Sequence, residues 1–216
     1  NGTVRNFGRF QVQSTTAVYN GTFNNSDRYE SDHAKNVFQD FILDQQGYIK
    51  ASDSSFFIAG DFLNGGGDGR WNTDSSSLTL TGAGLHHMQL NGTDKGAWRD
   101  GYANNRAWSE LVLGAGGSLD LTDGLPVRRN GRAALYVGEV TFEDGIGQLS
   151  NIASDYNIYY DPTLAGNAYL GGRSYAFGSG SGSLVAAAVP EPESFALVLA
   201  GLAMTTFVRR RLRPSN

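Results

Sequence analysis

Apolar and polar residues alternate in short segments along most of the chain, a pattern typical of β-strands with one buried face. The clearest alternations lie at residues 7–12, 77–81 and 118–122. Further strands are predicted at residues 17–19, 22–23, 37–43, 47–50, 55–59, 87–90, 111–113, 134–137, 140–142 and 157–160. The polar segment 26–35 has no apolar period, so it is predicted to be a loop or a short helical turn.

Asn-Gly dipeptides separate many of these segments, and both residues of the pair accept the positive φ angles of tight turns. They begin at Asn1, Asn20, Asn64, Asn91 and Asn130, with spacings loosely near multiples of about 20 residues. One coil of a β-solenoid has about this length, and stacked coils bury a continuous core. We therefore predict an all-β fold, a right-handed β-solenoid. A β-sandwich of hairpins would use the same turns and is the alternative.

The composition agrees with an ordered, exported β protein. Of 216 residues, 29 are glycine, 12% are aromatic and 18% are charged, which is too apolar for a disordered chain and too rich in glycine for a helical one. There is no cysteine, so disulfides and thiol chemistry are excluded. The formal net charge is −4, with no basic stripe outside the C-terminal end, so nucleic-acid binding is not expected. Because the chain starts at Asn1 without an apolar leader, we expect a fragment or a mature form whose secretory peptide was removed.

The C-terminal end carries three elements in a fixed order. A proline-rich motif comes first, formed by Val189, Pro190, Glu191 and Pro192. The uncharged apolar run 195–208 follows; as a helix it would be about 21 Å long, shorter than the roughly 30 Å hydrocarbon core of a bilayer. The last element is an arginine cluster, formed by Arg209, Arg210, Arg211 and Arg213. The positive-inside rule keeps these arginines in the cytoplasm and places residues 1–190 outside.

This order of elements closely resembles the PEP-CTERM sorting signal of bacteria that make exopolysaccharide, which is read by a membrane transpeptidase called exosortase. The resemblance implies that residues 189–192 are the recognition motif and that the arginine cluster is the cytoplasmic retention signal. It also implies a transient membrane anchor with the apolar side chains Phe195, Leu197, Val198, Leu199, Leu202, Phe207 and Val208. The partners implied are exosortase and, transiently, the inner membrane.

Residues 157–172 and 174–176 look like the membrane-proximal end of many PEP-CTERM surface proteins, whose upstream parts are Gly- and Asn-rich predicted β-helices. Segments 60–64, 71–74 and 134–138 also look like elements of that group. The resemblance divides the chain into an extracellular solenoid-like domain at 1–177, a Gly/Ser/Ala linker at 178–188 and the sorting signal at 189–213. We expect a short helix at 164–169 to cover one end of the stack, because an open coil leaves an unpaired strand edge.

Three groups of residues are candidate metal ligands. Segment 63–69 resembles the calcium-binding nonapeptide GGxGxD, but its Asp68 comes one residue early and no second copy supplies further ligands. Asp53, Asp61, Asp68 and Asp74 are close in sequence, and solvated turn positions explain them as well. His86 and His87 point to opposite faces of a strand and His33 is distant in sequence, so they predict no shared metal. No cofactor is therefore predicted, with calcium at Asp68 and Asp74 as the alternative.

Three tryptophans are the candidate sugar-binding residues, because aromatic planes dock on the apolar faces of sugar rings. Exposed in a row, Trp71, Trp98 and Trp108 could stack on a polysaccharide. Packing in the core is the other use of these rings. Residues 97–109 around them are predicted to be a polar loop or a short helix that leaves the stack.

Together these features predict an exported, non-enzymatic protein of the cell surface or the extracellular matrix, with exopolysaccharide as its partner. The alternative is a polysaccharide-cleaving β-helix enzyme, a lyase or a glycosidase. Such an enzyme needs paired carboxylates, or calcium with a Lys or Arg base, and the sequence shows no motif of either kind. It also lacks a G-x-S-x-G nucleophile elbow.

Overall fold

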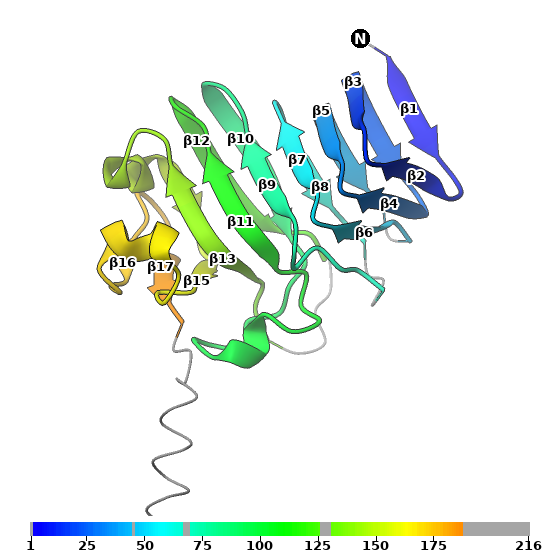
Figure 1. Ribbon diagram of the computed structural model, residues 1–216. Coiled ribbons are helices and arrows are strands. Elements are labelled where there is room, and N and C mark those ends of the chain that lie inside the picture. The colour runs from blue at the N-terminus through cyan, green and yellow to red at the C-terminus, as the bar shows by residue number, and fades with distance from the viewer. Residues whose placement is uncertain (1, 45, 67–69, 126–130, 188–216) are drawn as a thin grey trace, which may run out of the picture.

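The computed structural model describes residues 2–44, 46–66, 70–125 and 131–187, and this part of the chain is all-β (Figure 1). Most strands belong to one curled sheet with two flanks. The first flank contains β3 (Thr16–Asn25), β5 (Lys35–Leu43), β7 (Ser55–Ile58), β9 (Ser77–Leu80), β11 (Trp108–Leu113), β13 (Ala134–Phe142), β15 (Asn157–Tyr160) and β17 (Ser183–Ala186). The second flank contains β1 (Thr3–Asn6), the ends of β3 and β5, β8 (Phe62–Asn64), β10 (Gly84–Leu90), β12 (Gly117–Asp123) and β14 (Ile152–Ser154).

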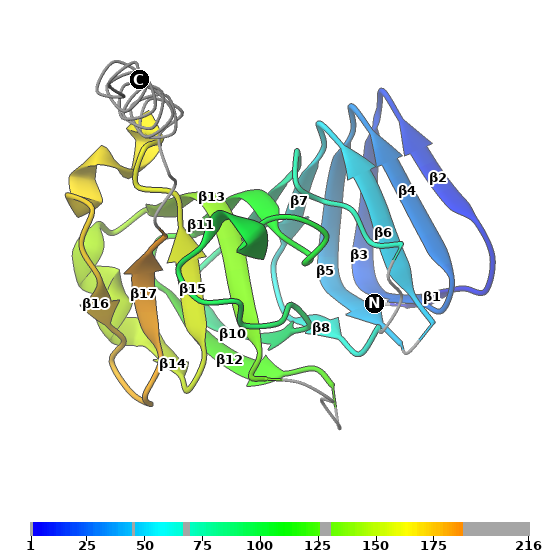
Figure 2. The same cartoon turned by 90° about the horizontal axis from the view of Figure 1, so that it is seen from below.

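A separate three-stranded sheet closes the N-terminal part of the molecule (Figure 2). Its strands are β2 (Phe10–Gln13), β4 (Arg28–Asp32) and β6 (Tyr48–Ser52). The remaining elements are β16 (Tyr175–Ala176) and the 3₁₀ helices η1 (Arg99–Gly101), η2 (Ile146–Asn151) and η3 (Ala165–Leu170). All strand pairs between named strands are parallel except β16 with β17. A sandwich of hairpins pairs consecutive strands antiparallel, so that alternative is wrong for the described strands.

In-register parallel pairing places inward side chains directly above one another and builds the core as stacks of like residues. Phe23, Phe41 and Phe62 form one such stack, with ring centroids 5.5 Å and 6.0 Å apart and nearly parallel planes. Farther along the chain, aliphatic residues continue the core, for example Leu78 and Leu111, which are paired in register. The alternation seen in the sequence is thus the alternation between this core and solvent.

Three local expectations are corrected by the structure. Asn20-Gly21 is not a turn but lies inside β3, where the pairing with β5 shifts register between Tyr19 and Thr22. The predicted loop at 26–35 contains strand β4, whose inward residues Tyr29 and Ser31 are buried. The predicted linker 178–188 contains strand β17, which pairs with β15, and Ala187 after it is fully buried. The folded domain therefore extends at least to residue 187.

The short helix expected at 164–169 is present as η3, and one side chain explains why it lies over a strand edge. Beyond Val137, β13 is no longer paired with β15, which covers only its first four residues. Asn167 of η3 takes the place of the missing strand: its Oδ1 accepts from the Val140 amide at 3.0 Å, and its Nδ2 donates to the Gly138 carbonyl at 2.8 Å. Tyr169 adds a bond from its hydroxyl to the Val140 carbonyl at 2.8 Å.

The sorting tail at 189–213 and Asp68 lie outside the described residues. Within the described ranges, no helix is both long and apolar enough to span a membrane.

Candidate functional site

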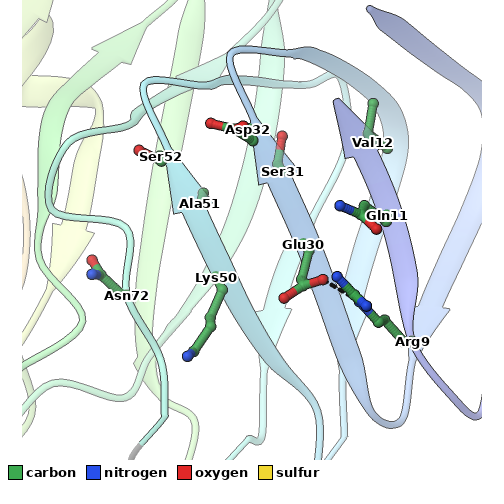
Figure 3. Close-up of a pocket in the computed structure, with 10 residues that line it drawn as sticks. All are labelled: Arg9, Gln11, Val12, Glu30, Ser31, Asp32, Lys50, Ala51, Ser52 and Asn72. Atoms are coloured by element: carbon green, nitrogen blue, oxygen red, sulfur yellow. Dashed lines mark hydrogen bonds and ion pairs between the residues drawn. The ribbon is translucent and has the colours of Figure 1, made fainter. Parts of the chain in front are cut away.

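A row of polar side chains crosses the outer face of the β2–β4–β6 sheet (Figure 3). Gln11 is paired in register with Glu30, and Glu30 with Lys50. Lys50 forms a parallel bridge with Asn72, which extends the row beyond β6. Neighbouring strands lie about 4.8 Å apart, so these four positions span about 14 Å across the strands. We call Gln11, Glu30, Lys50 and Asn72 the polar row.

The polar row borders a shallow groove of about 300 Å³. The small inward residues Val12, Ser31 and Ala51 are buried, so only their backbone forms the floor. The other border is formed by polar residues two positions farther along the strands, including Asp32 and Ser52, which are paired in register. The complete lining is Arg9, Gln11, Val12, Glu30, Ser31, Asp32, Lys50, Ala51, Ser52 and Asn72.

Charges in the groove are arranged in alternation rather than as one patch. The Glu30 carboxylate pairs with the guanidinium groups of both Arg9 and Arg28, so its charge is more than neutralised. Lys50 is exposed on the next strand, and it forms no ion pair with any residue that the structure describes. The groove thus offers three kinds of hydrogen-bonding group: the Glu30 carboxylate, which two arginines fix in place, the Lys50 ammonium group, and the side-chain amides of Gln11 and Asn72. This set suits a ligand rich in hydroxyl groups, with room for an anionic substituent at Lys50.

A histidine stands at the edge of this groove. His33 follows Asp32 in the turn after β4; its Nδ1 lies 2.7 Å from Asp32 Oδ1 and its Nε2 lies 3.6 Å from Asp53 Oδ2. The hydrogen bond with Asp32, together with the charges of both carboxylates, raises the pKa of His33 above its usual value. His33 and Asp53 adopt positive φ angles of 48° and 45°, as does Ser14 at 50°, since each occupies the same corner of a successive turn.

The three tryptophans considered as candidates for a sugar-stacking row do not lie on one surface. Trp71 and Trp108 are 6% and 2% exposed and pack edge to face, with centroids 6.4 Å apart. Their rings fill the core beside Phe62, so for Trp71 and Trp108 the structure shows core packing, the other use considered for them, and not a stacking row. Trp98 alone is exposed, with 64% of its surface accessible, in the loop that contains η1.

The acidic and histidine candidates are also separated. Asp74 is exposed in a turn, where its amide is bonded to the Asn72 side chain at 3.2 Å. Asp61 lies on the second flank, where its Oδ1 accepts from the His87 amide at 2.9 Å and lies 3.1 Å from His87 Nδ1. His86 and His87 point to opposite faces as predicted: His86 is buried, and its Nδ1 lies 2.8 Å from the Gly60 carbonyl oxygen. Among the described residues, no group of three or more His, Cys, Asp and Glu side chains could hold a metal ion.

Sequence reasoning did not single out the polar row. Its residues come from three different strands and a bridge, and successive members are 19, 20 and 22 residues apart in sequence. The signal that was available is the segment Arg28–Asp32, in which Tyr29 and Ser31 alternate with charged residues. That alternation predicts a strand only if the polar Ser31 can point inward. It can do so here because its hydroxyl accepts a hydrogen bond from the buried Asn36 side chain at 2.8 Å.

Comparison with known proteins found no similar protein. No family model matches the chain, no curated protein is significantly similar to it, and no solved structure matches its fold.

Proposed function

We propose that this chain is an exported, non-enzymatic protein of the cell surface or the exopolysaccharide matrix that binds polysaccharide along the polar row. The observation that carries the proposal is the register of Gln11, Glu30, Lys50 and Asn72, which repeats a polar side chain at each strand spacing. An extended polysaccharide repeats its hydroxyl groups at a similar interval, so successive sugars meet successive side chains. Binding then rests on many weak hydrogen bonds and needs no reacting group.

We further propose that the fold is a right-handed β-solenoid, in which the two flanks and the β2–β4–β6 sheet are the faces of successive coils. The pairing of β3 with β5, β5 with β7 and β7 with β9 supports this proposal, because each strand lies beside its counterpart one coil later. A stack of this kind is stiff and repeats its surface along one axis. Both properties suit a protein that holds an extended polymer.

The route to the surface is the third part of the proposal. The resemblance of residues 189–213 to a PEP-CTERM signal supports export, transient anchoring in the inner membrane and processing by exosortase at residues 189–192. C-terminal peptide mapping by mass spectrometry, on protein from the producing bacterium, tests this route. Processing predicts a C-terminus near residues 189–193 and no peptide from residue 195 onward. An intact arginine-rich end in the membrane fraction would contradict it.

Binding is tested with the purified exopolysaccharide of the producing bacterium. Lys50→Ala and Gln11→Ala each remove one hydrogen-bonding group worth about 0.5–1.5 kcal/mol, so each is expected to weaken affinity by about two- to tenfold. The matched control is Thr122→Ala, an exposed polar residue of β12 on the second flank. If the wild type and the three variants bound the polysaccharide with equal affinity, the polar row would not be the binding surface.

The same incubations separate this function from a polysaccharide lyase or glycosidase. A non-enzymatic protein leaves the reducing ends and the ultraviolet absorbance of the polysaccharide unchanged. Turnover that is lost in Asp68→Ala or Asp74→Ala would establish the enzymatic alternative instead.

A further inference from the structure

The loop that carries the exposed Trp98 is held rigidly on the domain. Residues 91–107 leave the end of β10 and return to β11, covering the outer face of the first flank. The Tyr136 hydroxyl accepts from the Lys95 amide at 2.9 Å and donates to the Gly96 carbonyl at 2.7 Å. The Tyr159 hydroxyl donates to Asp94 Oδ1 at 2.9 Å. The two tyrosine rings stack with centroids 4.6 Å apart, so the loop is bound to a firm base.

Tight packing at the same base directs Trp98 away from the domain. Gly101 of η1 lies so close to the Tyr136 ring that any Cβ there would overlap it. Here η1 packs closely on the Tyr136 ring, and Trp98, the residue directly before η1, is 64% exposed. Lys95 and Arg99 flank it on the surface, and the Lys95 ammonium donates to the Asp100 carbonyl at 2.9 Å. The loop thus exposes a large aromatic ring, with the cations Lys95 and Arg99 and the acid Asp100 within three residues of it in sequence.

The chain leaves the described domain beside this loop. Ala187, the last described residue, is fully buried in a small cluster with Tyr136 and Tyr159, and Ala97 and Tyr102 of the loop pack against the same cluster. Only residues 188–194 separate Ala187 from the apolar run 195–208. Fully extended, the eight Cα–Cα steps from Ala187 to Phe195 span at most about 29 Å.

We propose that Trp98 docks into the headgroup region of the bilayer while the apolar run is inserted, with Lys95 and Arg99 against the lipid phosphates. Tryptophan is enriched at membrane interfaces because its ring is apolar while its N–H remains hydrated, and nearby cations favour anionic lipids. The short connection keeps the loop within reach of the bilayer. Docking holds the motif at residues 189–192 close to the membrane surface. This inference rests on the proposed membrane insertion of the tail.

Tryptophan fluorescence tests the docking directly. The chain has three tryptophans, two of them buried in the core, and the tail contains none. The full chain is reconstituted into vesicles of phosphatidylethanolamine and phosphatidylglycerol, with and without brominated acyl chains, which quench tryptophans at the bilayer. Docking predicts quenching of the wild type by brominated lipid and no quenching of Trp98→Leu. Because Trp98 is exposed, this variant is expected to keep its thermal stability.

The outcomes distinguish the two proposals. If the protein floats with the vesicles but brominated lipid does not quench it, docking is overturned and tail insertion stands. If the protein does not float, tail insertion fails and docking fails with it. If Trp98 is shielded from acrylamide by the exopolysaccharide and not by vesicles, the ring is a sugar platform and the membrane assignment is overturned.

Discussion

Replacing Asn167 by alanine tests how the unpaired edge of β13 is closed. Asn167 is fully buried, and its side chain serves one amide and two carbonyls: Val140 N–H at 3.0 Å, the Gly138 oxygen at 2.8 Å and the Asp161 oxygen at 2.6 Å. The Asn167→Ala variant leaves these backbone groups without their partner, and each unsatisfied buried group costs about 1–3 kcal/mol. Since water can reach part of this edge after the change, we expect a loss of about 3 kcal/mol in the free energy of unfolding.

Urea denaturation followed by far-ultraviolet circular dichroism measures this loss. The midpoint is expected to fall without a change in slope, because the surface exposed on unfolding stays the same. For a domain of this size the melting temperature would fall by about 6–12 °C. The matched control is Asn151→Ala at the exposed end of η2, which is expected to change stability by less than about 0.5 kcal/mol. A loss below about 1 kcal/mol for Asn167→Ala would refute the view that this side chain replaces a missing strand.

Two further predictions concern the loop and the groove edge. Gly101→Ala places a methyl group against the Tyr136 ring, so we expect thermal denaturation to show a loss of about 1–3 kcal/mol in the free energy of unfolding. The control is Gly147→Ala, whose added methyl group meets no atom within 4 Å. Equal stabilities of the two variants would contradict the close packing of Gly101 on Tyr136. Because the folded pKa of His33 is raised, its stabilising effect is complete below the unfolded pKa of about 6.5 and is lost as pH rises through the folded pKa. NMR titration is expected to show this raised pKa and its fall in Asp32→Asn, and an unchanged pKa in that variant would show that Asp32 is not the cause.

The strands with an apolar inward face could be predicted from the sequence. Segments 77–81 and 118–122 carry leucine at every second position, and both coincide with strands in the structure, as does the more continuously apolar segment 37–43. Strand β4 could not be predicted this way, because its inward Ser31 is polar and is satisfied by Asn36, a residue of the next strand. The dipeptide Asn20-Gly21 was misleading for a related reason. Its turn propensity is weaker than the parallel pairing that β3 makes with β5 on both sides of it.

The all-β class and the chemistry of each residue of the candidate site could be inferred from the sequence alone. Both follow from local properties, namely side-chain type and the two-residue period of a half-buried strand. Which of these residues lie side by side depends on the tertiary structure. The register of parallel strands brings Gln11, Glu30, Lys50 and Asn72 into one row, and the same stacking sends Trp71 and Trp108 into the core while Trp98 remains outside. Register depends on the fit of all side chains between neighbouring strands, so contacts between residues about 20 positions apart arise only when the whole sheet is assembled.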